Sequence, residues 1–453
     1  MKAITSKIAG ILAISVSLFI TSCQRDADMM DPIDQELEVV LHKASGNIGK
    51  AHFQLPSSSD FGMIPQDPKN PLSADKVALG KLLFHETKLG LNPRMSQGLL
   101  TYSCASCHHS RAGFQFGLAQ GIGEGGSGFG AHGEGRHMDV SYANDSCDMQ
   151  PLRSPSALNV AYQTNMLWNG QFGATHKNVG TQAFWTPGTP KSFNTLGFQG
   201  PETQAIAGQN VHRLKVDTAF FMNNPVYKAL FDKAFMDLPE SERITQITVG
   251  LAIAAYERTL LANEAPFQQY LKGYETAMGD DEKRGAILFF GKAGCYKCHN
   301  GPALNSMEFY ALGMGDMSTG NPGVAYADPN KPDNMGRGSF TGAASDMYKF
   351  KVPQLYNIKE AGFYGHGGNF TSVKAVVEYK NAGVSQNSKV PSSQLAAEFV
   401  PLHLSAEEVN QLVTFIEKSL RDPRLDRYVP STLPSGQCFP NNDAQSKIDM
   451  GCN

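Results

Sequence analysis

Two copies of one five-residue motif decide the fold: Cys104-Ala105-Ser106-Cys107-His108 and Cys295-Tyr296-Lys297-Cys298-His299. Two thiols at this spacing can form thioethers with the two vinyl groups of one haem, and the adjacent imidazole then binds the iron. A zinc site built from Cys-x-x-Cys pairs would not need a His after both pairs. A thioredoxin-like pair would stand alone in a βαβ context, which is absent here. We therefore predict two covalently attached haem c groups, with His108 and His299 as proximal ligands.

The two motifs have matching surroundings. The first follows Val77-Ala-Leu-Gly-Lys-Leu-Leu-Phe-His85, and the second follows Lys283-Arg-Gly-Ala-Ile-Leu-Phe-Phe290. Each segment reads as a short amphipathic helix that contains a glycine, so the repeat predicts two related domains. We expect a signal peptide at 1–22, a tether at 23–70, an N-terminal haem domain at 71–272, a C-terminal haem domain at 273–425 and a Cys-containing tail at 426–453.

Helical patterns dominate the chain between these motifs. Ser73 is placed to begin a helix, and apolar residues return at helical spacing in residues 244–262. Ser405 and Glu408 form a capping box before another such run. Strand-like alternation is scarce, and residues 113–135 are so rich in glycine that we expect a loop. The predicted fold class is mostly α, with two cytochrome c-like domains and Gly/Pro-rich loops.

The first 23 residues resemble a targeting segment. Lys2 and Lys7 precede an apolar run that is too short for a comfortable membrane span. The residues before Cys23 resemble the lipobox of bacterial lipoproteins, so we expect lipid attachment at Cys23 in an exported, periplasmic protein, with the outer membrane favoured. The alternative is an ordinary signal peptide with a chance cysteine. The net charge of −3 argues against a nucleic-acid partner. The only expected membrane contact is the lipid.

Three further cysteines, Cys147, Cys438 and Cys452, lie outside these motifs. Disulfides persist in exported proteins, and the irregular tail that holds the last two is a plausible place for one. Three thiols cannot all pair with one another, so the sequence leaves the pairing open.

Further motifs resemble, in the same order, those of the bacterial di-haem cytochrome c peroxidases and of their relatives that oxidise tryptophans of a partner protein. The resemblance is collinear over about residues 74–422. Besides the two haem motifs, the matching stretches are Leu79–Phe84, Ser154–Asn159, Leu167–Gly170, Tyr256–Leu260, Gly336–Arg337, Phe350–Leu355, Tyr364–Gly368 and Pro401–Ser405.

The resemblance implies different roles for the two haems. The haem at His299 would receive electrons and carry protein ligands on both faces, whereas the haem at His108 would have a face open to peroxide. Trp168 matches the family's electron relay between the haems, although an aromatic at this place can also serve only packing.

Around the peroxide, the family uses a Gln and a Glu. Gln182 matches the Gln, and Glu202 is the candidate for the carboxylate that moves a proton during O–O cleavage. Another register would put Ile206 at the Glu position, and the alternative for Glu202 is a solvated surface carboxylate.

The sixth ligand of the second haem departs from the family pattern. The family places a Met or a Tyr fourteen residues after the His that corresponds to His366, and here that position is Lys380, with Tyr379 beside it. A neutral Lys amine can bind iron, so both residues are candidates. Met335 and Met347 are the fallbacks, although methionine more often serves packing.

Two other features of the family are less clear in this sequence. Some members have a distal His that leaves the resting peroxidatic haem, and the candidates are His109, His132 and His137, each of which can equally be an ordinary loop residue. A Ca²⁺ at the domain interface would take carbonyls near Ala361 and Phe363.

The Asn that serves as a calcium ligand in the family has no clear counterpart. Arg153 and Ser154 stand before Pro155 at this place, and Asn159 is a weaker substitute.

The resemblance predicts an enzyme that reduces hydrogen peroxide to water with electrons from a small c-type cytochrome or a cupredoxin. One alternative is a di-haem oxidase of a protein or small-molecule substrate, which a Tyr sixth ligand would favour. The other is a di-haem electron carrier without catalysis. A homodimer is left open.

Overall fold

The computed structural model describes residues 31–452, so the predicted signal peptide and Cys23 lie outside the described residues. The α-helices are α1 Pro32–Ala44, α2 Ala74–His85, α3 Gly200–Val211, α4 Thr218–Asn223, α5 Pro225–Ala234, α6 Gln246–Arg258, α7 Pro266–Leu271, α8 Asp280–Phe290, α9 Gly338–Thr341, α10 Val373–Ala382, α11 Ala406–Thr414 and α12 Ala444–Met450. Within residues 31–452, no helix has both the length and the apolar character needed to span a bilayer.

Strands make up very little of the fold. Two antiparallel pairs of two-residue strands are present, β1 Gly126–Ser127 with β2 His137–Met138 and β3 Phe309–Tyr310 with β4 Phe350–Lys351. The mostly helical fold predicted from the sequence is therefore confirmed.

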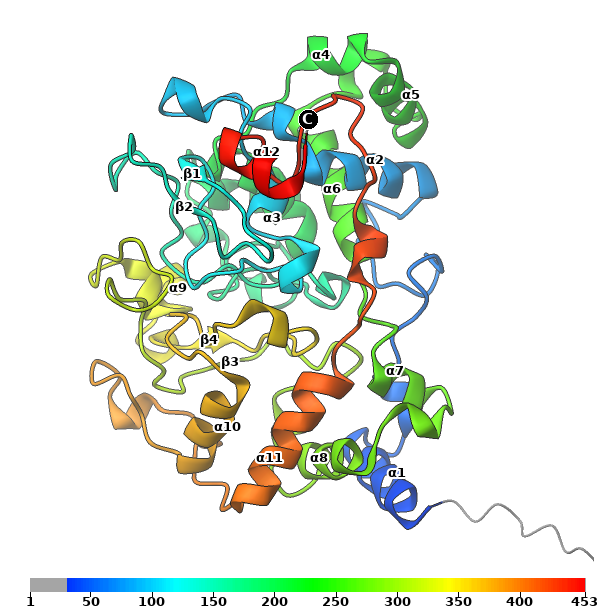
Figure 1. The fold of residues 1–453 in the computed structure, drawn as a ribbon, viewed down its shortest axis with the longest axis vertical. Helices are drawn as coiled ribbons and strands as arrows, with labels where there is room; N and C mark the ends of the chain where they lie inside the picture. The colour runs from blue at the N-terminus through cyan, green and yellow to red at the C-terminus, as the bar shows by residue number, and fades with distance from the viewer. Residues whose placement is uncertain (1–30, 453) are drawn as a thin grey trace, which may run out of the picture.

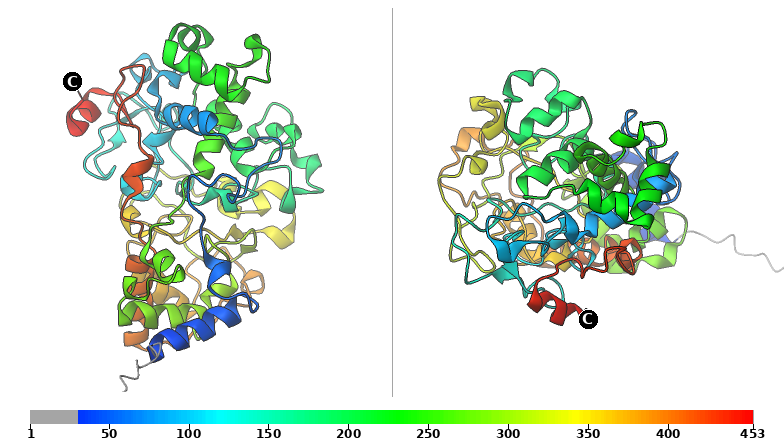
Figure 2. Two further views of the ribbon diagram at one scale, coloured as in Figure 1. Left: turned by 90° about the vertical axis from the view of Figure 1, so that its right-hand side faces the viewer. Right: turned by 90° about the horizontal axis from the view of Figure 1, so that it is seen from above.

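The molecule has two halves stacked along its long axis (Figure 1). One half contains α2, α3 and α6, and the other contains α8, α10 and α11, an arrangement that the side view repeats (Figure 2). The predicted helix starts are confirmed at α2 and α11, where Ser73 Oγ accepts the Lys76 N–H at 3.3 Å and Ser405 Oγ accepts the Glu408 N–H at 3.2 Å.

One glycine in each repeated helix permits a close helix crossing. A Cβ on Gly80 of α2 would lie 1.8 Å from the Ala252 carbonyl oxygen of α6, and a Cβ on Gly285 of α8 would lie 2.0 Å from the Gln411 oxygen of α11. No side chain fits in such a space, so each crossing requires glycine. In both copies of the repeat, the helix before the Cys-x-x-Cys-His motif, α2 or α8, thus crosses a helix that follows the motif, α6 or α11, at a glycine.

The tether predicted for residues 23–70 is wrong from residue 32 onward. Helix α1 buries Leu37 and Leu41 completely and packs on α8 of the C-terminal half. Asp34 Oδ1 also forms a buried ion pair with Lys283 Nζ at 2.7 Å. Burial of this apolar side stabilises the helix. The polar outer face of the same helix had favoured the prediction of a tether.

Whereas the N-terminal helix α1 packs on the C-terminal half, the C-terminal tail packs on the N-terminal half, where α12 lies beside β1 (Figure 1). The Asp449 carboxylate accepts the Phe129 and Gly130 N–H groups at 2.7 and 3.0 Å. The Pro440 carbonyl accepts the Ser103 and Ser106 hydroxyls at 2.8 and 3.2 Å, at the first haem motif. The plausible Cys438–Cys452 disulfide is present, and Cys147 is a buried free thiol.

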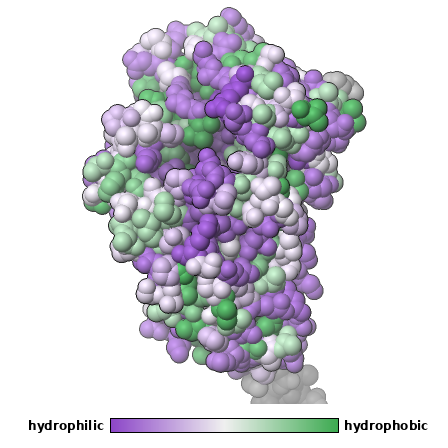
Figure 3. Space-filling model, turned by 90° about the vertical axis from the view of Figure 1, so that its left-hand side faces the viewer, coloured by the Kyte–Doolittle hydropathy of each residue, from purple (hydrophilic) through white to green (hydrophobic). Residues whose placement is uncertain are grey.

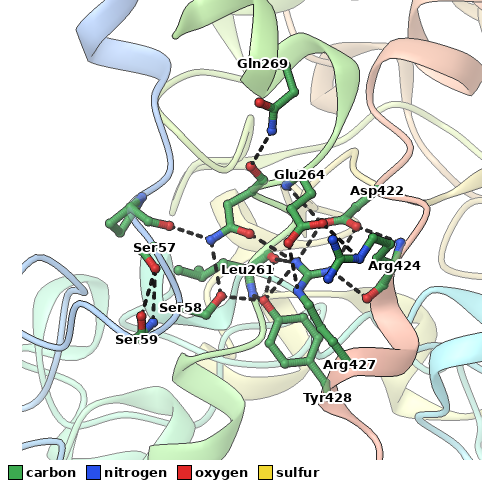
Figure 4. Close-up of polar contacts among 12 residues, drawn as sticks. Ser57, Ser58, Ser59, Leu261, Glu264, Gln269, Asp422, Arg424, Arg427 and Tyr428 are labelled. Carbon is green, nitrogen blue, oxygen red and sulfur yellow. Dashed lines mark hydrogen bonds and ion pairs between the residues drawn. The ribbon is translucent and has the colours of Figure 1, made fainter.

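A polar network joins three distant segments between the halves (Figure 4). Arg427 Nη2 lies 2.8 Å from Oδ2 of Asp422, whose side chain is fully buried. The Tyr428 hydroxyl lies 2.8 Å from the Leu261 carbonyl oxygen and 2.5 Å from Ser58 Oγ. This network ties the chain after α11 to the α6–α7 connection and to the segment before α2.

On the face shown in Figure 3, hydrophobic residues lie in small groups among hydrophilic ones. This face therefore carries no single continuous apolar patch of the kind that marks a large protein interface.

Candidate functional site

The two Cys-x-x-Cys-His motifs adopt the same local structure. The first cysteine of each motif begins a 3-10 turn, Cys104–Ser106 in one and Cys295–Lys297 in the other. The backbone N–H of each histidine bonds back to the carbonyl of this cysteine, at 3.2 Å for His108 and 2.9 Å for His299. In the second motif, Cys295, Cys298 and His299 line one cavity. All four cysteines are free thiols in the structure, as haem attachment requires.

Both imidazoles have their Nδ1 atom committed to backbone carbonyls. His108 Nδ1 lies 3.3 Å from the Phe114 oxygen, and His299 Nδ1 lies 3.1 Å from the oxygens of both Leu304 and Pro353. A carbonyl only accepts, so Nδ1 carries the hydrogen and Nε2 keeps a lone pair for a metal. Burial lowers the pKa of both rings to about 4, which favours the neutral, ligating form.

A cavity of about 660 Å³ opens in front of His299. Cys295 and Cys298 lie on its wall, and one face of α10 forms another part of the wall. The residues of that face are Val373, Val376, Val377 and Lys380, at the spacing of one helical stripe. A cavity of this size with the thiols and the imidazole on its wall fits a haem attached at Cys295 and Cys298.

The two candidates for the sixth ligand point in different directions. Lys380 lines the cavity, and its amine makes no hydrogen bond or ion pair within the described residues, with the Phe399 ring 5.5 Å away. Burial lowers the pKa of Lys380 to about 8. Tyr379 lies instead in an aromatic cluster with Phe370 and Phe399, and its hydroxyl donates to the Leu312 carbonyl at 2.5 Å.

The structure therefore brings Lys380, and not Tyr379, to the cavity that His299 lines. Met335 and Met347 are also absent from the lining residues of this cavity.

Trp168 lines the cavity of His299, and its ring centroid lies 6.4 Å from that of the His366 ring. On the other side, its indole N–H donates to the Arg153 carbonyl at 2.8 Å. Two residues further along the chain, the Pro155 carbonyl is near enough to the His108 ring to affect its pKa. The predicted relay is thus linked through the Arg153–Pro155 main chain to the surroundings of His108.

Glu202 and Gln182 are not brought together. Glu202, on α3, is fully buried, and its carboxylate accepts from Arg258 Nε at 2.8 Å and Nη2 at 2.7 Å and from Asn70 Nδ2 at 3.3 Å. Gln182 is exposed on a 3-10 turn. The alternative of a solvated Glu202 is therefore wrong, whereas Ile206, on the same helix, is a buried apolar residue.

Glu257 is a second buried carboxyl group that the sequence reasoning missed. Its Oε2 atom has no hydrogen-bond partner within residues 31–452, and its charge acts on Cys104. Burial, together with repulsion by Glu202, raises the pKa of Glu257 to about 8. The position next to Arg258 in the Tyr256–Leu260 motif was the available signal, but only the fold shows that the side chain is buried.

The three candidates for a distal His have different surroundings. His109 is buried, and both of its ring nitrogens lack a partner within the described part of the chain, so burial lowers its pKa to about 3. His132 and His137 are exposed.

Comparison with known proteins decides the family. The model of the di-haem cytochrome c peroxidase family matches residues 74–276. Methylamine utilization protein MauG of Methylorubrum extorquens is 31% identical over 378 residues, which cover 83% of this chain and 85% of that protein. The chain belongs to the di-haem cytochrome c peroxidase family. Cytochrome c551 peroxidase of Nitrosomonas europaea is 27% identical and covers 82% of this chain and 87% of its own length.

Among solved structures, a MauG-like protein associated with microbial copper homeostasis matches with a TM-score of 0.56 and 24% identity, covering 82% of this chain and 95% of that protein. This likeness shows the shared fold. The comparisons confirm the di-haem family and the haem peroxidase class that were expected from the sequence.

Proposed function

We propose that this di-haem peroxidase reduces hydrogen peroxide to water with electrons from a small c-type cytochrome or a cupredoxin. Cys104, Cys107 and His108 hold one haem c, and Cys295, Cys298 and His299 hold the other. Each haem, when bound, supplies a redox-active iron, and the His108 half is the one that meets peroxide. Electrons enter at the His299 half and cross by way of Trp168.

The position of Trp168 is the observation that supports this route of transfer best. Its ring forms part of the His299 cavity, and its N–H bonds to the main chain of Arg153. The main chain continues from there to Pro155, whose carbonyl affects the pKa of the His108 ring. One aromatic side chain therefore contacts the surroundings of both haem-binding histidines.

The substitution Trp168→Phe tests this role. We expect both haems to attach and their spectra to stay unchanged, while oxidation of reduced cytochrome c by peroxide falls at least tenfold. Trp185→Phe is the matched control, because Trp185 is the other tryptophan and its indole N–H donates to the nearby Thr181 Oγ1 at 3.1 Å. Equal turnover in the two variants would exclude Trp168 as the relay.

We further propose that Glu202 and Glu257 handle the proton. The ion pair with Arg258 requires an ionised Glu202, whereas Glu257 holds a proton on its carboxyl group at neutral pH. Two neighbouring carboxyl groups kept in opposite protonation states are suited to accept and return one proton. If this is right, Glu257→Gln lowers peroxide turnover while the reduction of the haems by the donor remains as in the wild type.

We also propose Lys380 as the sixth ligand of the haem at His299, because its amine is buried in that cavity without an acceptor. In Lys380→Ala, EPR should show the low-spin signal of this haem replaced by a high-spin one, and added methylamine should restore it. Tyr379→Phe and Met314→Leu are the controls, since Met314 lines the same cavity. A low-spin signal that persists in Lys380→Ala would rule out the assignment.

The proposal contains no calcium ion. Asn159 Oδ1 already accepts the Ala262 N–H at 3.1 Å, and a buried Arg153 cation stands before Pro155. No group of three or more His, Cys, Asp or Glu side chains within residues 31–452 could hold a metal ion. The calcium site expected from the family uses main-chain carbonyls near Ala361 and Phe363 instead of such side chains, so the calcium ion stays a prediction.

The alternative of substrate oxidation was tied to a Tyr sixth ligand. Because Tyr379 lies outside the cavity, peroxide reduction remains the proposed activity, and the test with reduced cytochrome c separates it from both alternatives.

Export with lipid attachment at Cys23 is also proposed, on the sequence pattern alone. Labelling with a radioactive fatty acid tests it, with Cys23→Ser as the unlabelled control.

A further inference from the structure

The cavity in front of His299 has an unbalanced charge. Among the described residues that line it, Glu398 is the only carboxylate. Apart from Lys380, which is proposed to bind iron as a neutral amine, the lining cations are Arg153, Lys292, Lys297 and Lys351. A cavity with this composition is suited to an anionic occupant.

Two of these cations are deeply buried and lack an acidic partner. Arg153 is 3% exposed, and its guanidinium donates to the Leu118 carbonyl at 3.0 Å and to Gln115 Oε1 at 3.1 Å. Lys351 is 6% exposed, and its amine donates to Gln163 Oε1. Neither forms an ion pair within residues 31–452. A buried charge is costly unless it is paired, so both cations call for an anion.

Both cations are connected to the relay tryptophan through the main chain. The Lys351 N–H donates to the Trp168 carbonyl at 2.8 Å, and the Trp168 indole donates to the Arg153 carbonyl at 2.8 Å. Arg153 and Lys351 are therefore both bonded to Trp168 through their main chains, and all three residues line the cavity. Lys292, in contrast, is half-exposed and pairs with Glu408 at 2.7 Å.

We infer that Arg153 and Lys351 bind the two propionate carboxylates of the haem at His299, so that the propionate edge of that haem faces Trp168. This inference rests on the proposed function, because it takes haem c as the occupant. The lack of an acidic partner supports it: desolvation lowers the pKa of Lys351 to about 7, and no carboxylate among the described residues offsets this effect. The two cations would then place the haem edge at the relay.

The test is a redox titration of the whole protein carrying Lys351→Met. Losing a buried cation near the haem disfavours the added electron, so the midpoint potential of the His299 haem should fall. A unit charge roughly 10 Å away at an effective dielectric constant of about 20 changes the reduction constant about tenfold, which is about 59 mV for one electron. Arg153→Met should lower the potential in the same direction.

Lys351→Arg, which keeps the charge, should restore the potential, and Lys292→Met is the control for a cation at the rim. Resonance Raman spectra give a second readout, because the propionate bending modes report hydrogen bonding to the carboxylates. We expect these modes to shift in Lys351→Met and to stay unchanged in Lys292→Met.

Potentials and propionate modes in Lys351→Met that equal those of Lys292→Met would overturn the inference. If Lys351→Met does not attach the haem, Lys351→Gln, which can still bond to Gln163, provides the same comparison. Wild-type protein that lacks the second haem would instead refute the proposed function. The two failures are therefore distinguishable.

Discussion

Replacing Arg258 by Met should destabilise the protein severely. Both side chains of the Arg258–Glu202 pair are fully buried, and the pair is bidentate. Arg258 also donates to the Pro65 carbonyl at 3.0 Å and to Gln199 Oε1 at 3.1 Å. Without it, Glu202 keeps only Asn70 Nδ2 at 3.3 Å. Breaking a buried pair from one side costs about 3–5 kcal/mol, because the remaining charge is left uncompensated.

Urea unfolding followed by far-UV circular dichroism measures this loss. Adding Glu202→Gln to Arg258→Met should recover part of the stability, since the uncompensated charge is then removed. Lys374→Met is the control: Lys374 and Glu378 form an exposed pair at 4.0 Å, which contributes about 0–1 kcal/mol. If Arg258→Met loses no more stability than Lys374→Met, the buried pair between α3 and α6 does not contribute this stability.

Three further changes test other parts of the structure. Glu257→Gln should raise the free energy of unfolding more at pH 8 than at pH 5. The Glu257 carboxyl has a pKa of about 8 in the folded protein and about 4.3 in the unfolded chain. Between these pH values the free energy of unfolding of the wild type therefore falls by about 1.4 kcal/mol per pH unit. Parallel urea titrations at both pH values check this, and a difference independent of pH would contradict it. Replacing both Cys438 and Cys452 by Ser should lower the free energy of unfolding by about 3 kcal/mol for a loop of this length. It should also speed hydrogen exchange at the Phe129 amide, which Asp449 of the tail accepts. Unchanged exchange would show that the disulfide does not hold the tail on Phe129. Gly285→Ala should cost about 1–3 kcal/mol through overpacking, seen as a lower melting temperature, and an unchanged melting temperature would refute the close crossing.

Features encoded within a few residues could be predicted from the sequence. The haem turns, the Ser73 and Ser405 helix starts and the glycine-containing helices follow from local spacing, because capping and turn geometry involve neighbours in the chain. Helix α1 was missed because its outer face is polar and the surrounding composition suggested a tether. Its signal was present in Leu37 and Leu41, four residues apart and both fully buried.

The choice between Lys380 and Tyr379 shows where sequence reasoning ends. Adjacent residues on a helix point about 100° apart, so only the rotation of α10 decides which one lines the cavity. The helical spacing of Val373, Val376 and Val377 places Lys380 on the same stripe, so this spacing could have been used to choose Lys380 over Tyr379. The unpartnered Glu257 oxygen had no such signal, because its isolation depends on which other segments pack around α6.

The exchange of terminal segments between the halves means that neither haem unit is one continuous piece of chain. The Pro440 carbonyl that receives the Ser103 hydroxyl lies 337 positions downstream. A ribosome makes the chain from its N-terminus, so the Pro440 carbonyl that bonds to Ser103 and Ser106 is synthesised after helices α1 to α11. The first Cys-x-x-Cys-His motif therefore acquires its full set of hydrogen bonds only when almost the whole chain has been made.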